Sequence, residues 1–285
     1  MLAMMSLICV GLLGMAFLPD PMPQSFGEDP GSSDPDVEDG DDRESLENFL
    51  FGTDSDDFLV GGDQLEYVDG FGGDDMISGG DGPDRLHGGL GDDTIDGGGG
   101  RDALFGHIGD DRINGDIGDD RLVGGDGNDL LMGGEGDDLL SGSLGADRLV
   151  GGPGHDTFHG GEGDDILDGL SGEEHPERDY LNGGAGIDEI RAGLSDIVSG
   201  GTEADKFIVE LIAGDVNSPA EITDFVPGED EIEIQMPNGE LKPDIQIVSR
   251  DGGSLVFANG LPVVFVSNIE GLSASAIMAT SDFPE

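Results

Sequence analysis

The polar and apolar positions of this chain repeat every nine residues over its central part. From Gly52 to Asp168, 117 residues divide into thirteen nine-residue units without a break in phase. Each unit has six residues rich in Gly and Asp, followed by three residues whose middle member is apolar. Two successive examples are Gly79–His87, GGDGPDRLH, and Gly88–Asp96, GGLGDDTID. An insertion at residues 173–177 interrupts the phase, and weaker units continue to Ile208. A repeat of this kind predicts a solenoid.

Each unit predicts a tight turn followed by a short strand. Glycines at the first, second and fourth places allow the backbone conformations and close approach that a tight turn needs. The x-apolar-x ending directs one side chain inward. Two units then complete one coil, so residues eighteen apart stack about 4.8 Å apart in a parallel sheet. The two predicted interior ladders are Leu86, Leu104, Leu122, Leu140 and Phe158 on one side, and Ile77, Ile95, Ile113, Leu131, Leu149 and Leu167 on the other.

The C-terminal part has a different pattern. Alternating apolar residues in Ile232–Ile234, Ile245–Ile247, Leu255–Phe257 and Val263–Val266 predict antiparallel strands, and Asn259-Gly260 predicts a hairpin turn between the last two. Because a solenoid needs its open end covered, residues 209–285 are expected to form a β cap on a roll that spans residues 49–208.

The N-terminal part contains an uncharged apolar run at Leu2–Leu18, near the lower length limit for a membrane span. We expect residues 1–18 to be a hydrophobic signal or membrane anchor, with Gly14-Met15-Ala16 as a cleavage site in the first case; a misassigned start codon is the third interpretation. Residues 19–48 are rich in Pro, Ser, Asp and Glu, which predicts an acidic disordered linker.

Composition narrows the class of protein. The chain has 285 residues with 64 acids against 11 bases, a formal net charge of −53, and this charge repels nucleic acid. The single cysteine, Cys9, excludes an intramolecular disulfide framework and zinc sites built from several cysteines. The stability of the roll must therefore come from another source.

The acid at the sixth place of each unit points to that source. Stacked one coil apart, two such carboxylates repel by roughly 3 kcal/mol at an effective dielectric constant near 20, and each unit offers only one large apolar side chain in return. A row of carboxylates and turn carbonyls provides only oxygen ligands, which suit a hard cation. Calcium fits flexible all-oxygen geometry better than magnesium, so we expect several Ca²⁺ ions to contribute much of the folding energy.

The repeat resembles that of the RTX (repeats-in-toxin) calcium-binding proteins, G-G-x-G-x-D-x-U-x with U apolar, over about 155 residues. The resemblance implies an all-β fold, a right-handed parallel β-roll, with Ca²⁺ held between turns eighteen residues apart. The metal-binding aspartates that it implies are Asp84, Asp102, Asp120, Asp138 and Asp156 on one edge, and Asp75, Asp93, Asp111, Asp129, Asp147 and Asp165 on the other. Backbone carbonyls of the glycine turns are expected to complete each site.

The segment Ile222–Ile232, ITDFVPGEDEI, resembles the cap that follows the roll in RTX proteases of the serralysin type, which share I-x-D-F-x-x-G-x-D-x-I. In this family a C-terminal signal directs export through a type I secretion exporter. The tail Ser281–Glu285 partly resembles the acidic-then-apolar ending of some members. An N-terminal apolar segment is not expected for that route, so the export mechanism stays open.

No catalytic motif accompanies the repeats. The H-E-x-x-H signature of RTX proteases is missing, and His155 and His159 lie inside a repeat without the glutamate that such a site needs. We therefore expect a non-enzymatic, extracellular calcium-binding protein, released or tethered to the cell surface through residues 2–18. The alternatives are the secretion or stabilising module of a protease- or lipase-like hydrolase that has lost its catalytic domain, and a calcium-dependent adhesin.

Overall fold

The structure is a computed structural model that describes residues 48–170, 178–210, 218–236 and 243–281. These residues belong to one compact unit, Asp42–Glu285, and consist of β-strands joined by turns and one short 3-10 helix, Ala274–Ala276. No helix in these ranges is long and apolar enough to span a membrane. The predicted signal or anchor at residues 1–18 and the predicted linker up to residue 47 lie outside the described residues.

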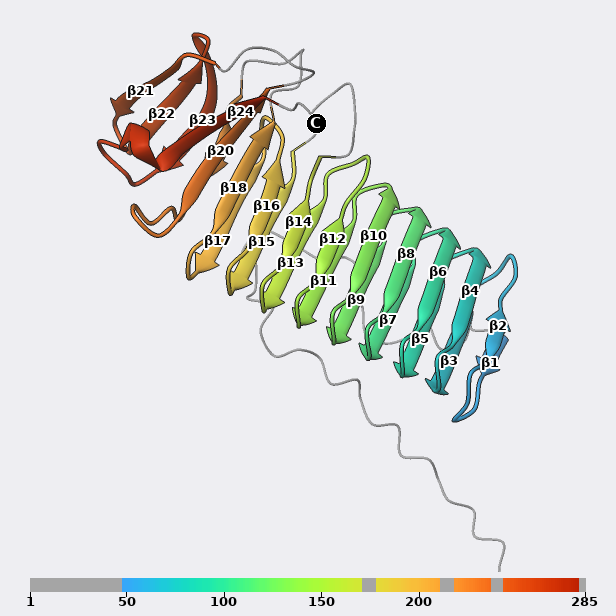
Figure 1. Cartoon of the computed structure of the whole chain (residues 1–285). Helices are drawn as coiled ribbons and strands as arrows, with labels where there is room; N and C mark the ends of the chain where they lie inside the picture. Colours follow the sequence, from blue (N-terminus) through green and yellow to red (C-terminus); the bar gives the residue numbers. More distant parts are fainter. Residues whose placement is uncertain (1–47, 171–177, 211–217, 237–242, 282–285) are drawn as a thin grey trace, which may run out of the picture. The chain divides into compact units, whose positions relative to one another are not determined.

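Up to β20 (Glu231–Met236) the strands alternate between two sheets as the chain coils, so the odd-numbered strands form one sheet and the even-numbered strands the other (Figure 1). The thirteen-stranded sheet has the order β1 (Asn48–Phe51), β3 (Glu66–Gly72), β5 (Arg85–Leu90), β7 (Ala103–Ile108), β9 (Arg121–Asp126), β11 (Leu139–Leu144), β13 (Thr157–Glu162), β15 (Tyr180–Ala185), β17 (Ile197–Thr202), β19 (Ala220–Ile222), β23 (Leu261–Ser267), β22 (Gly253–Ala258) and β21 (Ile245–Arg250). The eleven-stranded sheet has the order β2 (Phe58–Val60), β4 (Met76–Asp81), β6 (Thr94–Gly99), β8 (Arg112–Ile117), β10 (Leu130–Glu135), β12 (Arg148–Val150), β14 (Ile166–Asp168), β16 (Glu189–Ala192), β18 (Lys206–Glu210), β20 (Glu231–Met236) and β24 (Ile277–Ser281). The predicted parallel β-roll is therefore confirmed.

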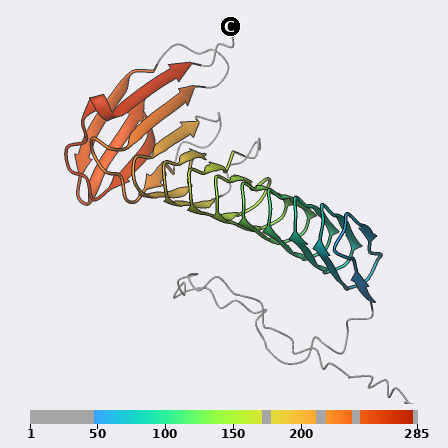
Figure 2. The ribbon, with the colours of Figure 1, turned by 60° about the horizontal axis from the view of Figure 1, so that its bottom comes forward.

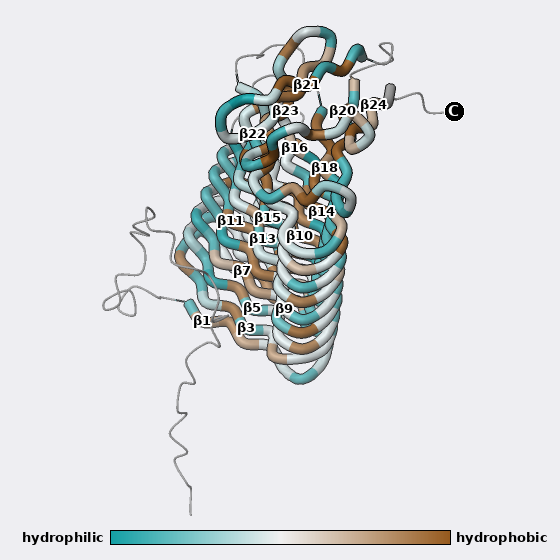
Figure 3. Tube along the Cα trace, turned by 90° about the vertical axis from the view of Figure 1, so that its left-hand side faces the viewer, coloured by the Kyte–Doolittle hydropathy of each residue, from teal (hydrophilic) through white to brown (hydrophobic). Residues whose placement is uncertain are grey.

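The register between neighbouring strands is the eighteen-residue step that the repeat predicts. Leu86 of β5 pairs with Leu104 of β7, and Ile95 of β6 pairs with Ile113 of β8. Both predicted apolar ladders form, and all their members are at most 2% exposed. The turns stack in line as the coils follow one another, in the tube of Figure 3 and the rotated ribbon of Figure 2. The interior of the roll is thus one large apolar side chain wide on each side.

Most strands are longer than the three residues predicted for each unit. β5 and β7, for example, have six residues, because they continue into the first three places of the next unit. The glycines there also pair across coils, as Gly89 does with His107. The expectation of a three-residue strand was wrong, since small turn residues can still make parallel backbone hydrogen bonds.

The insertion and the C-terminal part modify the register without ending the sheets. Thr157 pairs with Tyr180, a step of 23, which is the eighteen-residue step plus five inserted residues. β20, which contains Ile232–Ile234, was expected to be antiparallel but is parallel to β18 and β24. Among the strands in the described ranges, only β21, β22 and β23 pair in antiparallel fashion. Asn259 and Gly260 have positive φ angles of 52° and 83° in the predicted hairpin turn.

Candidate metal centre

The turns of the roll place an acid directly before most strands. Each such acid is hydrogen-bonded to the next one along the same edge, and these connections define two rows. Row A, on the edge leading into the thirteen-stranded sheet, is Glu66, Asp84, Asp102, Asp120, Asp138, Asp156, Asp179 and Asp196. Row B, leading into the eleven-stranded sheet, is Asp57, Asp75, Asp93, Asp111, Asp129, Asp147, Asp165, Asp188, Asp205 and Asp230. All eleven predicted aspartates lie in these rows and are at most 3% exposed.

One carboxylate oxygen of every row member except Glu66 is held by a backbone N–H. The N–H of Asp75 donates to Oδ1 of Asp93 at 2.8 Å, and the N–H of Asp84 donates to Oδ1 of Asp102 at 2.7 Å. The same bond recurs along both rows. It fixes the orientation of each side chain, because the donor belongs to the rigid start of a neighbouring strand.

The second oxygen has no such partner over most of each row. Oδ2 is buried without a hydrogen-bond partner in all eleven predicted aspartates and in Asp188, and Oε2 is so placed in Glu66. Oδ2 of Asp84 lies over the first glycine of its own unit, where a β-carbon on Gly79 would collide with it. A buried charged oxygen without a partner costs several kcal/mol unless another group compensates it.

The glycines at the second and fourth places bring carbonyl oxygens close to the same turns. Gly80 and Gly98 have positive φ angles of 109° and 100°. A β-carbon on Gly80 would meet the carbonyl oxygen of Gly62, and one on Gly98 would meet that of Gly80. At these glycines the turns stack with backbone carbonyls between them, so an added β-carbon would require a local shift, whereas Phe71, His107, Asp116 and Ser143 hold the second place of other units with positive φ.

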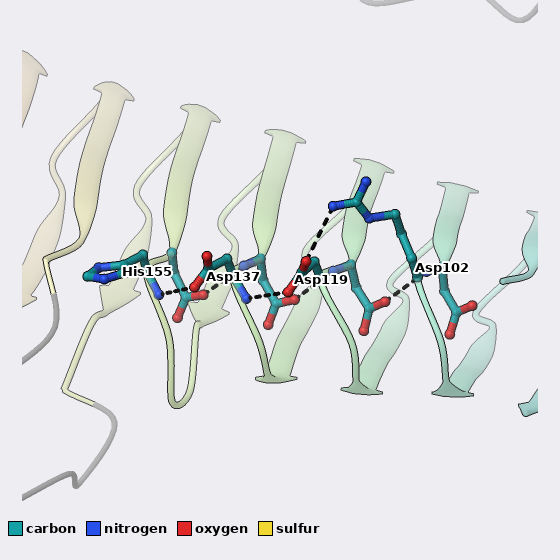
Figure 4. Close-up of polar contacts among 8 residues, drawn as sticks. Asp102, Asp119, Asp137 and His155 are labelled. Carbon is teal, nitrogen blue, oxygen red and sulfur yellow. Dashed lines mark hydrogen bonds and ion pairs between the residues drawn. The ribbon is translucent and has the colours of Figure 1, made fainter. Parts of the chain in front are cut away.

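A second line of polar residues runs along each edge at the fifth place, outside the buried rows. On the edge of row A, the N–H of Asp137 donates to Oδ1 of Asp119 at 3.1 Å, and the N–H of His155 donates to Oδ1 of Asp137 at 2.9 Å. Figure 4 shows these bonds beside the row A bond from Asp102, together with the exposed ion pair between Arg101 and Asp119. These carboxylates are solvent-exposed, and their hydrogen bonds run in the opposite direction along the roll from those of the buried row.

Burial and mutual repulsion disfavour the charged form of the buried carboxylates. The pKa of Asp156 is raised to about 8: burial is the main cause, the hydrogen bond from the Asp138 backbone opposes the shift, and the neighbouring carboxylates of Asp179 and Asp138 add to it. Burial is also the main reason that the pKa of Asp111 rises to about 7 and that of Asp93 to about 6. At neutral pH the carboxylates of these rows ionise readily only if a positive charge lies beside them.

The chemistry of the rows fits a hard cation. Each coil offers a fixed carboxylate oxygen without a partner, next to turn carbonyls, and no nitrogen or sulfur ligand takes part. No group of three or more His, Cys, Asp or Glu side chains in the described ranges is close enough to hold a metal without other ligands. A cation bound between coils would therefore combine carboxylates with backbone carbonyls, which is the ligand set that Ca²⁺ accepts.

Some row members were not among the predicted residues. Asp188 lies in Gly183–Arg191, GGAGIDEIR, which keeps the full pattern, so continuing the count past the insertion would have found it. Glu66 replaces the aspartate of a degenerate unit and still enters row A. The other row members beyond the prediction are Asp57, Asp179, Asp196, Asp205 and Asp230.

His155 and His159 do not form a histidine metal site. Nδ1 of His155 lies 3.0 Å from the backbone nitrogen of Arg178 and 3.2 Å from its carbonyl oxygen. His159 lies on β13, where burial lowers its pKa. One residue is in a turn and the other in a strand, so their spacing of four does not bring them onto one helix face.

Comparison with known proteins identifies the repeat. The family model of the RTX calcium-binding nonapeptide repeat (4 copies) matches residues 46–68, 69–104, 105–140, 141–173 and 177–206, more than half of the chain. No curated protein matches the chain. Among solved structures, the extracellular lipase LipA from Serratia marcescens matches with 14% sequence identity and a TM-score of 0.25, covering 81% of this chain and 40% of the lipase.

The nine-residue phase, the two buried rows of carboxylates and the glycine turns agree with the extent of this match. The chain belongs to the family of RTX calcium-binding nonapeptide repeat proteins.

Proposed function

We propose that this chain is a non-enzymatic, extracellular calcium-binding protein whose β-roll folds when Ca²⁺ binds after export. One observation carries the proposal. Thirteen buried carboxylate groups in the described residues each have an oxygen atom without a hydrogen-bond partner, and they recur at successive turns from Glu66 to Asp165 and again at Asp188. Calcium between the coils would compensate these charges, and the eleven predicted aspartates would be among its ligands.

Folding on calcium binding follows from the balance of energies in each coil. Burying one Leu or Ile side chain contributes about 1.5–3 kcal/mol, and each unit has one such residue in its ladder. An unpartnered buried carboxylate costs several kcal/mol. The apolar ladder alone therefore does not offset the cost of the rows, and the binding energy of the metal becomes folding energy.

The same balance favours an extracellular site of action. Extracellular calcium modules bind with dissociation constants of about 10⁻⁴–10⁻³ M, so a roll of this kind would stay unfolded where calcium is scarce. An unfolded chain can pass through an exporter, such as a type I secretion exporter, and fold on the calcium-rich side. Residues 2–18 would then act as a cleaved signal or as a tether, with residues 19–48 as spacer.

Far-UV circular dichroism of the full chain tests this proposal. After calcium removal the protein should lack most of its β signal, and adding Ca²⁺ at about 0.1–1 mM should restore it cooperatively. Mg²⁺ at the same concentrations is the control and should restore little, because it prefers octahedral geometry and retained water. A β spectrum that is unchanged by chelation would contradict calcium-driven folding.

A further inference from the structure

The ends of the two carboxylate rows differ from their middles. In the middle, one oxygen accepts a backbone N–H and the other is buried without a partner, as in Asp111 and Asp120. At the ends, Asn48 closes row A with a neutral side chain next to Glu66, and Asp57, Asp196 and Asp230 each have Oδ2 hydrogen-bonded within their own turn.

Row A is closed at both ends. Asn48 stands opposite Glu66 in the register of β1 and β3, at the place where another acid would continue the row. Its amide Nδ2 donates to Oε1 of Glu66 at 2.9 Å, which ends the series of charges with a neutral side chain. At the other end, Oδ2 of Asp196 accepts the backbone N–H of Gly193 at 2.7 Å.

Row B is closed at both ends by hydrogen bonds to Oδ2. Oδ2 of Asp57 accepts the backbone N–H of Thr53 at 2.7 Å and its hydroxyl at 2.8 Å. Oδ2 of Asp230 accepts the backbone N–H of Val226 at 2.7 Å. In each case the donor lies three or four residues earlier in the same turn, so the carboxylate caps its own turn.

We infer that the calcium-binding rows run from Glu66 to Asp156 and from Asp75 to Asp188, and that Asp57, Asp196 and Asp230 are capping residues. This inference rests on the proposed function. Glu66 and Asp188 are 3% and 1% exposed and each has a buried oxygen without a hydrogen-bond partner, and a cation beside each would compensate its charge. In the capping residues a hydrogen bond to the charged oxygen already offsets its burial. A cation there would have to displace that bond.

The inference also gives the caps a role. In each capping residue the second carboxylate oxygen is hydrogen-bonded within its own turn, so its charge is compensated without a cation. By closing each row with a protein donor, the chain ends the metal array inside the roll, before the strands that follow Asp196 and Asp230.

The number of Ca²⁺ ions bound per chain tests the inference. Native mass spectrometry of the full chain in saturating calcium would compare wild type with Glu66→Gln and Asp188→Asn, and with Asp57→Asn and Asp230→Asn as matched controls. We expect the first two variants to lose about one ion each and the controls to keep the wild-type number. An unchanged number in Glu66→Gln and Asp188→Asn, or a loss in the controls, would overturn the inference.

Two further measurements separate the loss of a calcium ligand from the loss of the fold. Glu66→Asp and Asp188→Glu retain the charge, so they should restore the bound ion if the residue is a ligand. Circular dichroism in saturating calcium separates loss of one ion from loss of the fold. If wild type binds no calcium at all, the proposed function itself fails, whereas normal total binding with the wrong residues affected contradicts only the assignment of the row ends.

Discussion

At the scale of single residues, the sequence repeat predicts the buried rows well because it repeats the chemistry as well as the spacing. All eleven predicted aspartates occupy the sixth place of a turn and are buried there. The repeat could not predict which acids have their second carboxylate oxygen hydrogen-bonded within their own turn. Asp57 has the same place in its unit as Asp75, yet only Asp57 has a threonine four residues earlier that donates to it. That difference lies in the neighbouring turn residues rather than in the acid.

Substitution of a turn glycine shows how closely the coils approach. Gly98 has a φ of 100°, and its β-carbon would meet the carbonyl oxygen of Gly80. Gly98→Ala should lower the stability of the calcium-loaded protein by more than the roughly 1 kcal/mol that a left-handed alanine costs. Gly252→Ala is the matched control, since Gly252 has a φ of 86° but nothing within 4 Å of the added carbon. Thermal unfolding in saturating calcium would measure both, and equal losses would show that contact between coils is unimportant.

At the scale of the strands, alternation in the sequence identifies buried faces but not the direction of the neighbouring strand. Ile232 and Ile234 are fully buried, as the alternation indicates, yet β20 pairs in parallel with β18 and β24. A strand with one buried face has the same pattern in either orientation. The antiparallel direction expected for β21, β22 and β23 is confirmed, and Asn259-Gly260, whose turn geometry requires an antiparallel return, gives its physical reason for the last pair.

The thin apolar ladder makes each of its members important to the whole roll. Leu122 is fully buried between Leu104 and Leu140. Leu122→Ala should destabilise the calcium-loaded protein by about 2–5 kcal/mol, because the neighbouring coils are held in register and cannot collapse into the cavity. Leu90, which is 57% exposed, is the control, and Leu90→Ala should change stability little. Chemical denaturation in saturating calcium would compare them, and a loss below about 1 kcal/mol for Leu122→Ala would mean that the ladder contributes little.

At the scale of the whole molecule, the acids determine how stability depends on pH, and the sign differs with and without calcium. Burial and neighbouring carboxylates raise the pKa of Asp84 to about 7, of Asp147 to about 7 and of Asp156 to about 8 in the folded state. In the unfolded chain they titrate near 4. Between these values the folded state binds more protons than the unfolded state, so the stability of the metal-free roll falls as the pH rises from about 4 to about 8.

Calcium reverses this dependence, because only the deprotonated carboxylates bind the ion. In calcium-depleted buffer the β signal and the unfolding temperature should therefore be higher near pH 5 than near pH 8, whereas in saturating calcium they should be higher near pH 8.

Asp156→Asn removes the acid whose pKa is raised to about 8. It should stabilise the metal-free protein near pH 8, where Asp156 is otherwise forced to ionise, and have little effect near pH 5, where Asp156 is protonated. Circular dichroism melts at both pH values, with and without calcium, would measure all four cases. A metal-free roll that becomes more stable as the pH rises would show that the buried rows do not limit folding.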